Sequence, residues 1–176
     1  MQSEFNKIAL SLNIPTVCII ALILLAGWSL FGALSYKNMR RIGIVMTIFV
    51  TLTILYITIF SRSKINATAY PVPFSTFTRA KTDSSLICFM IMNIIMFMPL
   101  GFSLPFVLYG KPRRRIGWTI FIGFMLSAFI EATQEIFSIG NADIDDVIVN
   151  TLGTAIGSFS YLLTLAFMKI TKKKAA

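Results

Sequence analysis

The sequence predicts an all-α fold, a polytopic bundle of about five transmembrane helices. Of its 176 residues 56% are hydrophobic and only 13% are charged, and the mean hydropathy is +0.80. A soluble domain has about a quarter of its residues charged. A span requires roughly 20 mostly apolar residues, because a helix rises about 1.5 Å per residue and the hydrocarbon core is about 30 Å thick. We therefore expect a single membrane domain over residues 1–176.

Five stretches of the chain are long and apolar enough to span. They are Ile14–Ser35, Ile42–Phe60, Ser84–Leu108, Ile116 to about Phe137, and Val147–Met168. The first stretch is longer than the apolar core of a secretory signal peptide, and only one lysine precedes it, so we expect it to be retained as a span.

The basic residues predict how the spans are oriented. Connections 36–41 and 109–115 and the C-terminal tail hold 11 of the 16 lysines and arginines, and the rest are spread over longer segments on the other side. Cytoplasmic connections carry the excess of basic residues, so we expect a cytoplasmic C-terminus and an outside N-terminus. The net charge of +9 is then explained by attraction to lipid headgroups. Membrane lipids are expected partners, and nucleic acid is not.

The acidic residues are concentrated near the outer ends of the last two spans. Five of the seven lie within residues 131–146, and they are Glu131, Glu135, Asp143, Asp145 and Asp146. A charge costs roughly 2.5–3.5 kcal/mol at the centre of a span and less near the interface, so such a group suggests a functional site. The aspartates also suit the N-terminus of the fifth span as caps, although one cap is normally enough.

Helical spacing brings further polar side chains to the same end. Ser127 and Gln134 lie on the face of Glu131, and Asn150 lies on the face of Asp143 and Asp146. On the third span the amide of Asn93 must face the bundle to find a partner. We therefore expect an outward-facing polar pocket formed by Asn93, Glu131, Gln134, Asp143, Asp145, Asp146 and Asn150, with Arg79, Glu135 and Ser127 in secondary positions.

The connection of residues 61–83 is expected to be an extracytoplasmic loop. It is long for a simple hairpin and contains the aromatic and proline sequence YPVPF at residues 70–74, which suits a segment lying over the bundle at the interface. Four basic residues of this loop could then meet the carboxylates, and they are Arg62, Lys64, Arg79 and Lys81.

Four small or helix-bending residues are expected to shape the packing. Pro99 removes a backbone donor and bends the third span, and Gly101 allows a neighbouring helix to approach closely. Gly153 and Gly157 form a GxxxG pattern that predicts close helix packing, which we expect within the subunit; the oligomeric state is left open.

The composition excludes several kinds of chemistry. The chain has no histidine, which removes Ser-His-Asp catalysis and histidine-ligated zinc. Residues 143–146 are too short for a calcium loop, so no metal or cofactor is expected, although the oxygen ligands leave a divalent cation open. Carboxylates and amides could act as acid and base, or bind a hydroxyl-rich, amide-rich or cationic ligand.

Three segments together resemble the VanZ-like membrane proteins. They are NIIMFMPLG at residues 93–101, SAFIEATQ at 127–134 and DIDDVIVNTLG at 143–153, and Pro73-Phe74 adds to them. The resemblance covers about residues 70–160. Many members of that family have Gly-Arg where this chain has Gly140-Asn141. If that arginine pairs with a carboxylate, its absence here leaves the acidic cluster more negative or leaves Arg79 to compensate.

The resemblance implies a multi-pass protein of the bacterial cytoplasmic membrane with an envelope role at its outer face. The family's namesake is associated with reduced susceptibility to teicoplanin, so a lipid-linked cell-wall precursor or a glycopeptide antibiotic would be the partner. Two other functions stay open. One is an integral-membrane enzyme that uses Glu131 as acid and base with Asp143 and Asp146 positioning the substrate or an ion. The other is a proton-coupled transporter or flippase with a buried Glu131 and a broken third helix.

Overall fold

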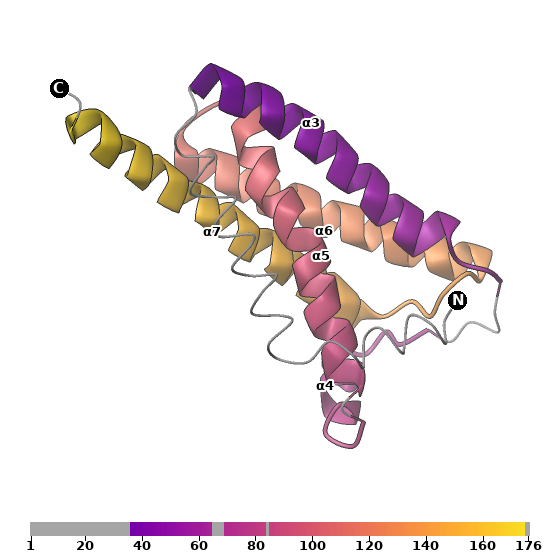
Figure 1. Cartoon of the computed structure of the whole chain (residues 1–176). Coiled ribbons are helices and arrows are strands. Elements are labelled where there is room, and N and C mark those ends of the chain that lie inside the picture. Colours follow the sequence, from indigo (N-terminus) through magenta and orange to yellow (C-terminus); the bar gives the residue numbers. More distant parts are fainter. Residues whose placement is uncertain (1–35, 65–68, 84, 175–176) are drawn as a thin grey trace.

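The described part of the chain is built almost entirely from helices. The computed structural model describes residues 36–64, 69–83 and 85–174. Its elements are α3 (Tyr36–Leu55), the π-helix η1 (Tyr56–Phe60), α4 (Ser75–Arg79), α5 (Ser85–Val107), α6 (Pro112–Phe137) and α7 (Ile144–Lys174). Figure 1 shows α3, α5, α6 and α7 as long rods, with the short α4 near the start of α5. The all-α fold class is therefore confirmed.

Four helices of the described chain are long and apolar enough to cross a membrane. They cover Asn38–Phe60, Ser85–Val107, Pro112–Phe137 and Ile144–Lys169. The expected span Ile14–Ser35 lies outside the described residues. The last helix begins three residues before the expected Val147, because Asp143 caps it: Asp143 Oδ1 accepts a hydrogen bond from the N–H of Asp145 at 2.9 Å.

Short connections make α5, α6 and α7 successive antiparallel neighbours. Residues 108–111 join α5 to α6, and residues 138–143 join α6 to α7. One end of the bundle therefore holds the end of η1, the starts of α5 and α7, and the end of α6. We call it the acidic end, because residues 131–146 lie there, and we call the opposite end, with the first turns of α3 and α6, the basic end.

Three glycines allow α5 and α7 to pack backbone against backbone. A Cβ on Gly101 would lie 2.0 Å from the carbonyl oxygen of Thr154, and a Cβ on Gly153 would lie 2.3 Å from that of Ile94. A Cβ on Gly157 would lie 2.1 Å from the carbonyl oxygen of Met98. The GxxxG prediction of close packing within the subunit is therefore confirmed.

Helix α5 is continuous across its two prolines. It runs from Ser85 to Val107 through Pro99 and Pro105. The interpretation of the third span as a broken helix is therefore wrong. Packing explains why the helix persists: Phe97 and Leu100 on either side of Pro99 are fully buried against Ile54 of α3 and Ile130 of α6.

Polar groups set the boundaries of α5 and α6. Asp83 Oδ1 accepts hydrogen bonds from the N–H and the hydroxyl of Ser85, at 3.0 and 2.6 Å, where α5 begins. These two bonds hold the pKa of the Asp83 carboxyl below its ordinary value. At the end of α6, Ser138 adopts the left-handed conformation with φ 52°, which turns the chain toward α7.

Candidate functional site

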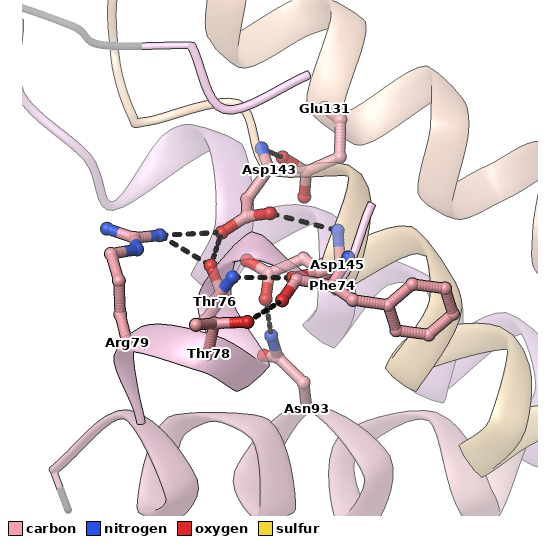
Figure 2. Close-up of polar contacts among 9 residues, drawn as sticks. Phe74, Thr76, Thr78, Arg79, Asn93, Glu131, Asp143 and Asp145 are labelled. Atoms are coloured by element: carbon pink, nitrogen blue, oxygen red, sulfur yellow. Dashed lines mark hydrogen bonds and ion pairs between the residues drawn. The ribbon is translucent and has the colours of Figure 1, made fainter. Parts of the chain in front are cut away.

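Asp145 holds the loop segment before α5 against the start of α7. Its carboxylate is fully buried, and its two oxygens accept hydrogen bonds from the N–H of Phe74 at 2.6 Å and of Thr76 at 2.7 Å (Figure 2). The five-residue helix α4 has no side-chain cap from its own N-cap residue, Phe74, so these donors would otherwise be unsatisfied. Asp145 therefore caps α4, although it lies 69 positions after Thr76 in the chain.

Asp143 strengthens the same attachment. While its Oδ1 caps α7, its Oδ2 accepts a hydrogen bond from the hydroxyl of Thr76 and lies 3.5 Å from the Nη2 of Arg79. Arg79 also donates to the Thr76 hydroxyl, and its guanidinium lies 4.0 Å from the ring centroid of Tyr70. Of the loop cations expected near the carboxylates, Arg79 therefore pairs directly with one of them.

A backbone bridge completes this attachment. The N–H of Tyr70 donates to the carbonyl of Ala142 at 2.8 Å, and the N–H of Ile144 donates to the carbonyl of Tyr70 at 3.3 Å. We call residues 70–79, held in this way by Asp143 and Asp145, the latch. It covers the acidic end of α7, where the loop was expected to lie over the bundle.

Asp146 faces α5 instead of the latch. Its Oδ1 accepts a hydrogen bond of 2.9 Å from the Nδ2 of Asn93. Asn93 therefore does face the bundle, as the cost of an unpaired amide in a span requires. The bond joins α5 to α7 about one helical turn after Asp143, the residue that holds the latch.

Glu131 completes the group from α6. It is 8% exposed, and its Oε2 accepts a hydrogen bond from the N–H of Asp143 at 2.9 Å. The carboxylates of Glu131 and Asp146 are close enough to interact electrostatically, and Arg62 interacts with both. We call Glu131 and Asp146 the carboxylate pair. Within the described residues, Glu131 Oε1 and Asp146 Oδ2 accept no hydrogen bond.

Two amides border the carboxylate pair. Asn150 is 3% exposed and donates from Nδ2 to the hydroxyl of Ser127 at 2.8 Å, while its Oδ1 is buried and has no partner among the described residues. Gln134 donates from Nε2 to the carbonyl of Thr58 at 3.0 Å. The oxygens left over around the pair are therefore acceptors, which suits a ligand that donates hydrogen bonds.

Gly140 leaves room for Arg62, a cation that no local pattern in the sequence distinguishes. A Cβ at this position would lie 2.8 Å from Arg62 Nη1 and 2.9 Å from Gln134 Oε1. In the sequence Arg62 is one of four loop cations expected near the carboxylates. Its place follows from η1, which ends at Phe60 beside the end of α6.

Glu135 does not join the group. It is exposed, whereas Ser127, Glu131 and Gln134 are buried on the face of α6 that packs in the bundle. In the described ranges, no three or more cysteine, aspartate and glutamate side chains are arranged to hold a metal ion. The chemistry available at the acidic end is therefore that of one carboxylate pair, two amides and Arg62.

The three segments that carry the sequence resemblance meet at this site. Asn93, Glu131 and Asp143 come from three different helices or their caps, and hydrogen bonds join their segments. A family model described as VanZ/LLP1 matches residues 16–166, which is most of the chain. The chain belongs to the VanZ/LLP1 family. The curated proteins contain no match to it, and neither do the solved structures.

The VanZ/LLP1 match is longer than the resemblance read from the motifs. It begins at residue 16 and so includes α3 and the residues before it, whereas the motifs lie within about residues 70–160. In this VanZ/LLP1 protein α3 contributes Ile54 to the core beneath the site, and η1 contributes the Thr58 carbonyl to Gln134. The earlier part of the match therefore includes residues that support the site without resembling the motifs.

Proposed function

We propose that this VanZ-like protein lies in the bacterial cytoplasmic membrane with its acidic end outside, and binds an envelope component or lipid-linked cell-wall precursor there. Binding of this kind would lower susceptibility to glycopeptide antibiotics such as teicoplanin. The observation that carries the proposal is the carboxylate pair, a buried Glu131 and a half-buried Asp146, in which one oxygen of each side chain accepts no hydrogen bond from the described residues. Ionisable groups inside a membrane protein are costly and generally functional.

The surplus of acceptors favours a ligand rich in hydroxyl, amide N–H or amine groups. Glu131 Oε1, Asp146 Oδ2 and Asn150 Oδ1 all lack a donor in the described chain. The sugar and peptide parts of a lipid-linked cell-wall precursor carry many such donors, and the lipid part would lie in the bilayer beside the bundle. The latch lies over this region, so a ligand would enter beside it or displace it.

Binding is favoured over catalysis because two of the three aspartates are already in use. Both oxygens of Asp143 and both of Asp145 accept hydrogen bonds from the protein. An enzyme at this site would depend on the carboxylate pair alone, with Glu131 as acid and base. Incubating the purified protein with candidate envelope lipids, with and without EDTA, and finding a new product by mass spectrometry would favour that second function.

We expect expression of the protein in a sensitive host to raise the inhibitory concentration of teicoplanin. Asp146→Asn and Glu131→Gln should return it to the value of the host alone at equal protein level, because each replaces one carboxyl oxygen of the pair with an NH₂ group, which donates instead of accepting, and keeps the shape of the side chain. Glu135→Gln is the matched control, since Glu135 is exposed on the same helix, and it should keep the full increase. No increase on expression, or an unchanged increase with Asp146→Asn, would contradict the proposal.

The orientation can be tested separately with single cysteines. In a background with Cys18 and Cys88 replaced by serine, we expect an impermeant maleimide to label Ser63→Cys on intact cells. Lys111→Cys should react only after the membrane is opened, because the basic end follows the positive-inside rule. Both positions are exposed. The opposite pattern would place the acidic end in the cytoplasm and remove the envelope ligand from reach.

A further inference from the structure

An open groove lies on α6 at the basic end, far along the helix from the carboxylate pair. It has a volume of about 400 Å³ and is lined by Arg114, Gly117, Trp118 and Phe121. Trp118 and Phe121 are each about half exposed, and their rings meet edge to face at 5.7 Å. A Cβ at Gly117 would meet nothing within 4 Å, so the floor of the groove is open.

The groove combines one cation with apolar walls. Arg114 is exposed in the first turn of α6, which contains no acidic residue, and Lys111 and Arg113 lie beside it. Trp118 and Phe121 follow one and two turns further into the span. Phe121 is seven positions after Arg114, which is roughly 10 Å along the helix at about 1.5 Å per residue.

This order of groups matches the order of groups in a membrane lipid. Arginine and tryptophan are favoured at the level of the headgroups, where the tryptophan ring lies between water and hydrocarbon. Deeper in the span, further apolar side chains on α6 are exposed: Phe124, Met125 and Phe129. A free phosphate would use only Arg114 and would make no contact with the apolar walls.

We infer that this groove binds an anionic phospholipid, with its phosphate on Arg114 and the beginning of an acyl chain against Trp118 and Phe121. The site is separate from the proposed function, since it lies at the opposite end of α6 from Glu131. An anionic headgroup is favoured over a zwitterionic one because the neighbouring Lys111 and Arg113 add positive charge and no carboxylate in the first turn of α6 offsets it.

Native mass spectrometry of the full chain tests this inference. The protein is equilibrated with equal amounts of phosphatidylglycerol and phosphatidylcholine, and the lipids retained on it are counted. We expect wild type to retain phosphatidylglycerol in preference, and Arg114→Gln to reduce that preference about fivefold, which corresponds to one basic residue near an anionic lipid. Arg114→Lys should keep most of it, and Trp118→Ala should reduce the retention of both lipids.

Arg113→Gln is the matched control, because Arg113 is also exposed in the same turn but does not line the groove. It should change the preference less than Arg114→Gln does. Equal retention of the two lipids by wild type, or equal effects of the two arginine variants, would overturn the inference. Displacement of phosphatidylglycerol by millimolar inorganic phosphate would overturn it too, because it would show that the acyl chain contributes nothing.

Discussion

Asp145→Asn is expected to release the latch from the start of α7 while the membrane-spanning helices stay folded. The asparagine has one acceptor oxygen for two backbone donors, and its NH₂ group would face the N–H of Phe74 or Thr76. The change therefore removes one charge-assisted hydrogen bond at a fully buried position. It also places the NH₂ group of the asparagine against a backbone N–H, so that two hydrogen-bond donors face each other. Such a change costs on the order of 3 kcal/mol.

Limited proteolysis measures this release. Trypsin cleaves after Arg79, which is held in the latch, and cleavage of a segment that opens and closes rapidly follows the population of its open form. A loss of about 3 kcal/mol corresponds to an increase on the order of 100-fold in that rate. Cleavage after Lys64, which precedes the latch, should change little.

Glu135→Gln is again the control, since it removes one carboxylate charge from an exposed position at the same end. It should leave the rate after Arg79 unchanged. If Asp145→Asn is cleaved after Arg79 no faster than this control, Asp145 does not hold the latch. Asp145→Glu provides a further check on the rate of cleavage after Arg79. Its longer side chain keeps the charge but cannot place both oxygens at the same two donors, so this rate should again exceed that of the control.

The spans were predictable because their signal is local. Apolar runs of about 20 residues predicted α5 to within one residue at each end, and glycines at a spacing of four predicted the contact of α7 with its neighbour. Asn93 could be placed for the same reason, since an amide inside a span has to find a partner. These inferences require only a residue's neighbours in sequence and the cost of an unpaired group.

The latch was not predictable because it depends on distant backbone groups. Helix α4 has five residues and begins after Phe74, whose φ of 64° is unusual for a residue with a side chain. Its partner is Asp145, but helical periodicity placed only Asp143 and Asp146 on the face of Asn150 and indicated no partner for Asp145. Nothing in residues 143–146 indicates that backbone N–H groups about 70 positions earlier complete the arrangement.

Gly101→Ala is expected to destabilise the bundle strongly, although it adds only one methyl group. Its Cβ would lie 2.0 Å from the carbonyl oxygen of Thr154 and 2.8 Å from the carbonyl carbon, and both belong to the backbone of α7. No side-chain rotation relieves that contact, so α5 and α7 must separate, which weakens the contacts of Gly153 and Gly157 as well. We expect a loss of about 3 kcal/mol, and hence an unfolding temperature in detergent about 6–12 °C lower.

Gly117→Ala is the matched control for this change, because it makes the same substitution in a helix where a Cβ meets nothing within 4 Å. Alanine favours a helix over glycine by up to about 1 kcal/mol, so this variant should be as stable as wild type or slightly more stable. The difference between the two variants then isolates the interhelical contact.

Adding Thr154→Ala should not rescue Gly101→Ala, since the clash is with backbone atoms. It should partly rescue Gly123→Ala, whose Cβ would lie 2.4 Å from the Thr154 hydroxyl oxygen. Rescue of Gly101→Ala by Thr154→Ala would show that the clash is with the Thr154 side chain and not with the backbone. An unfolding temperature equal to that of Gly117→Ala would show that α5 and α7 can separate without cost and that the glycines do not set their distance.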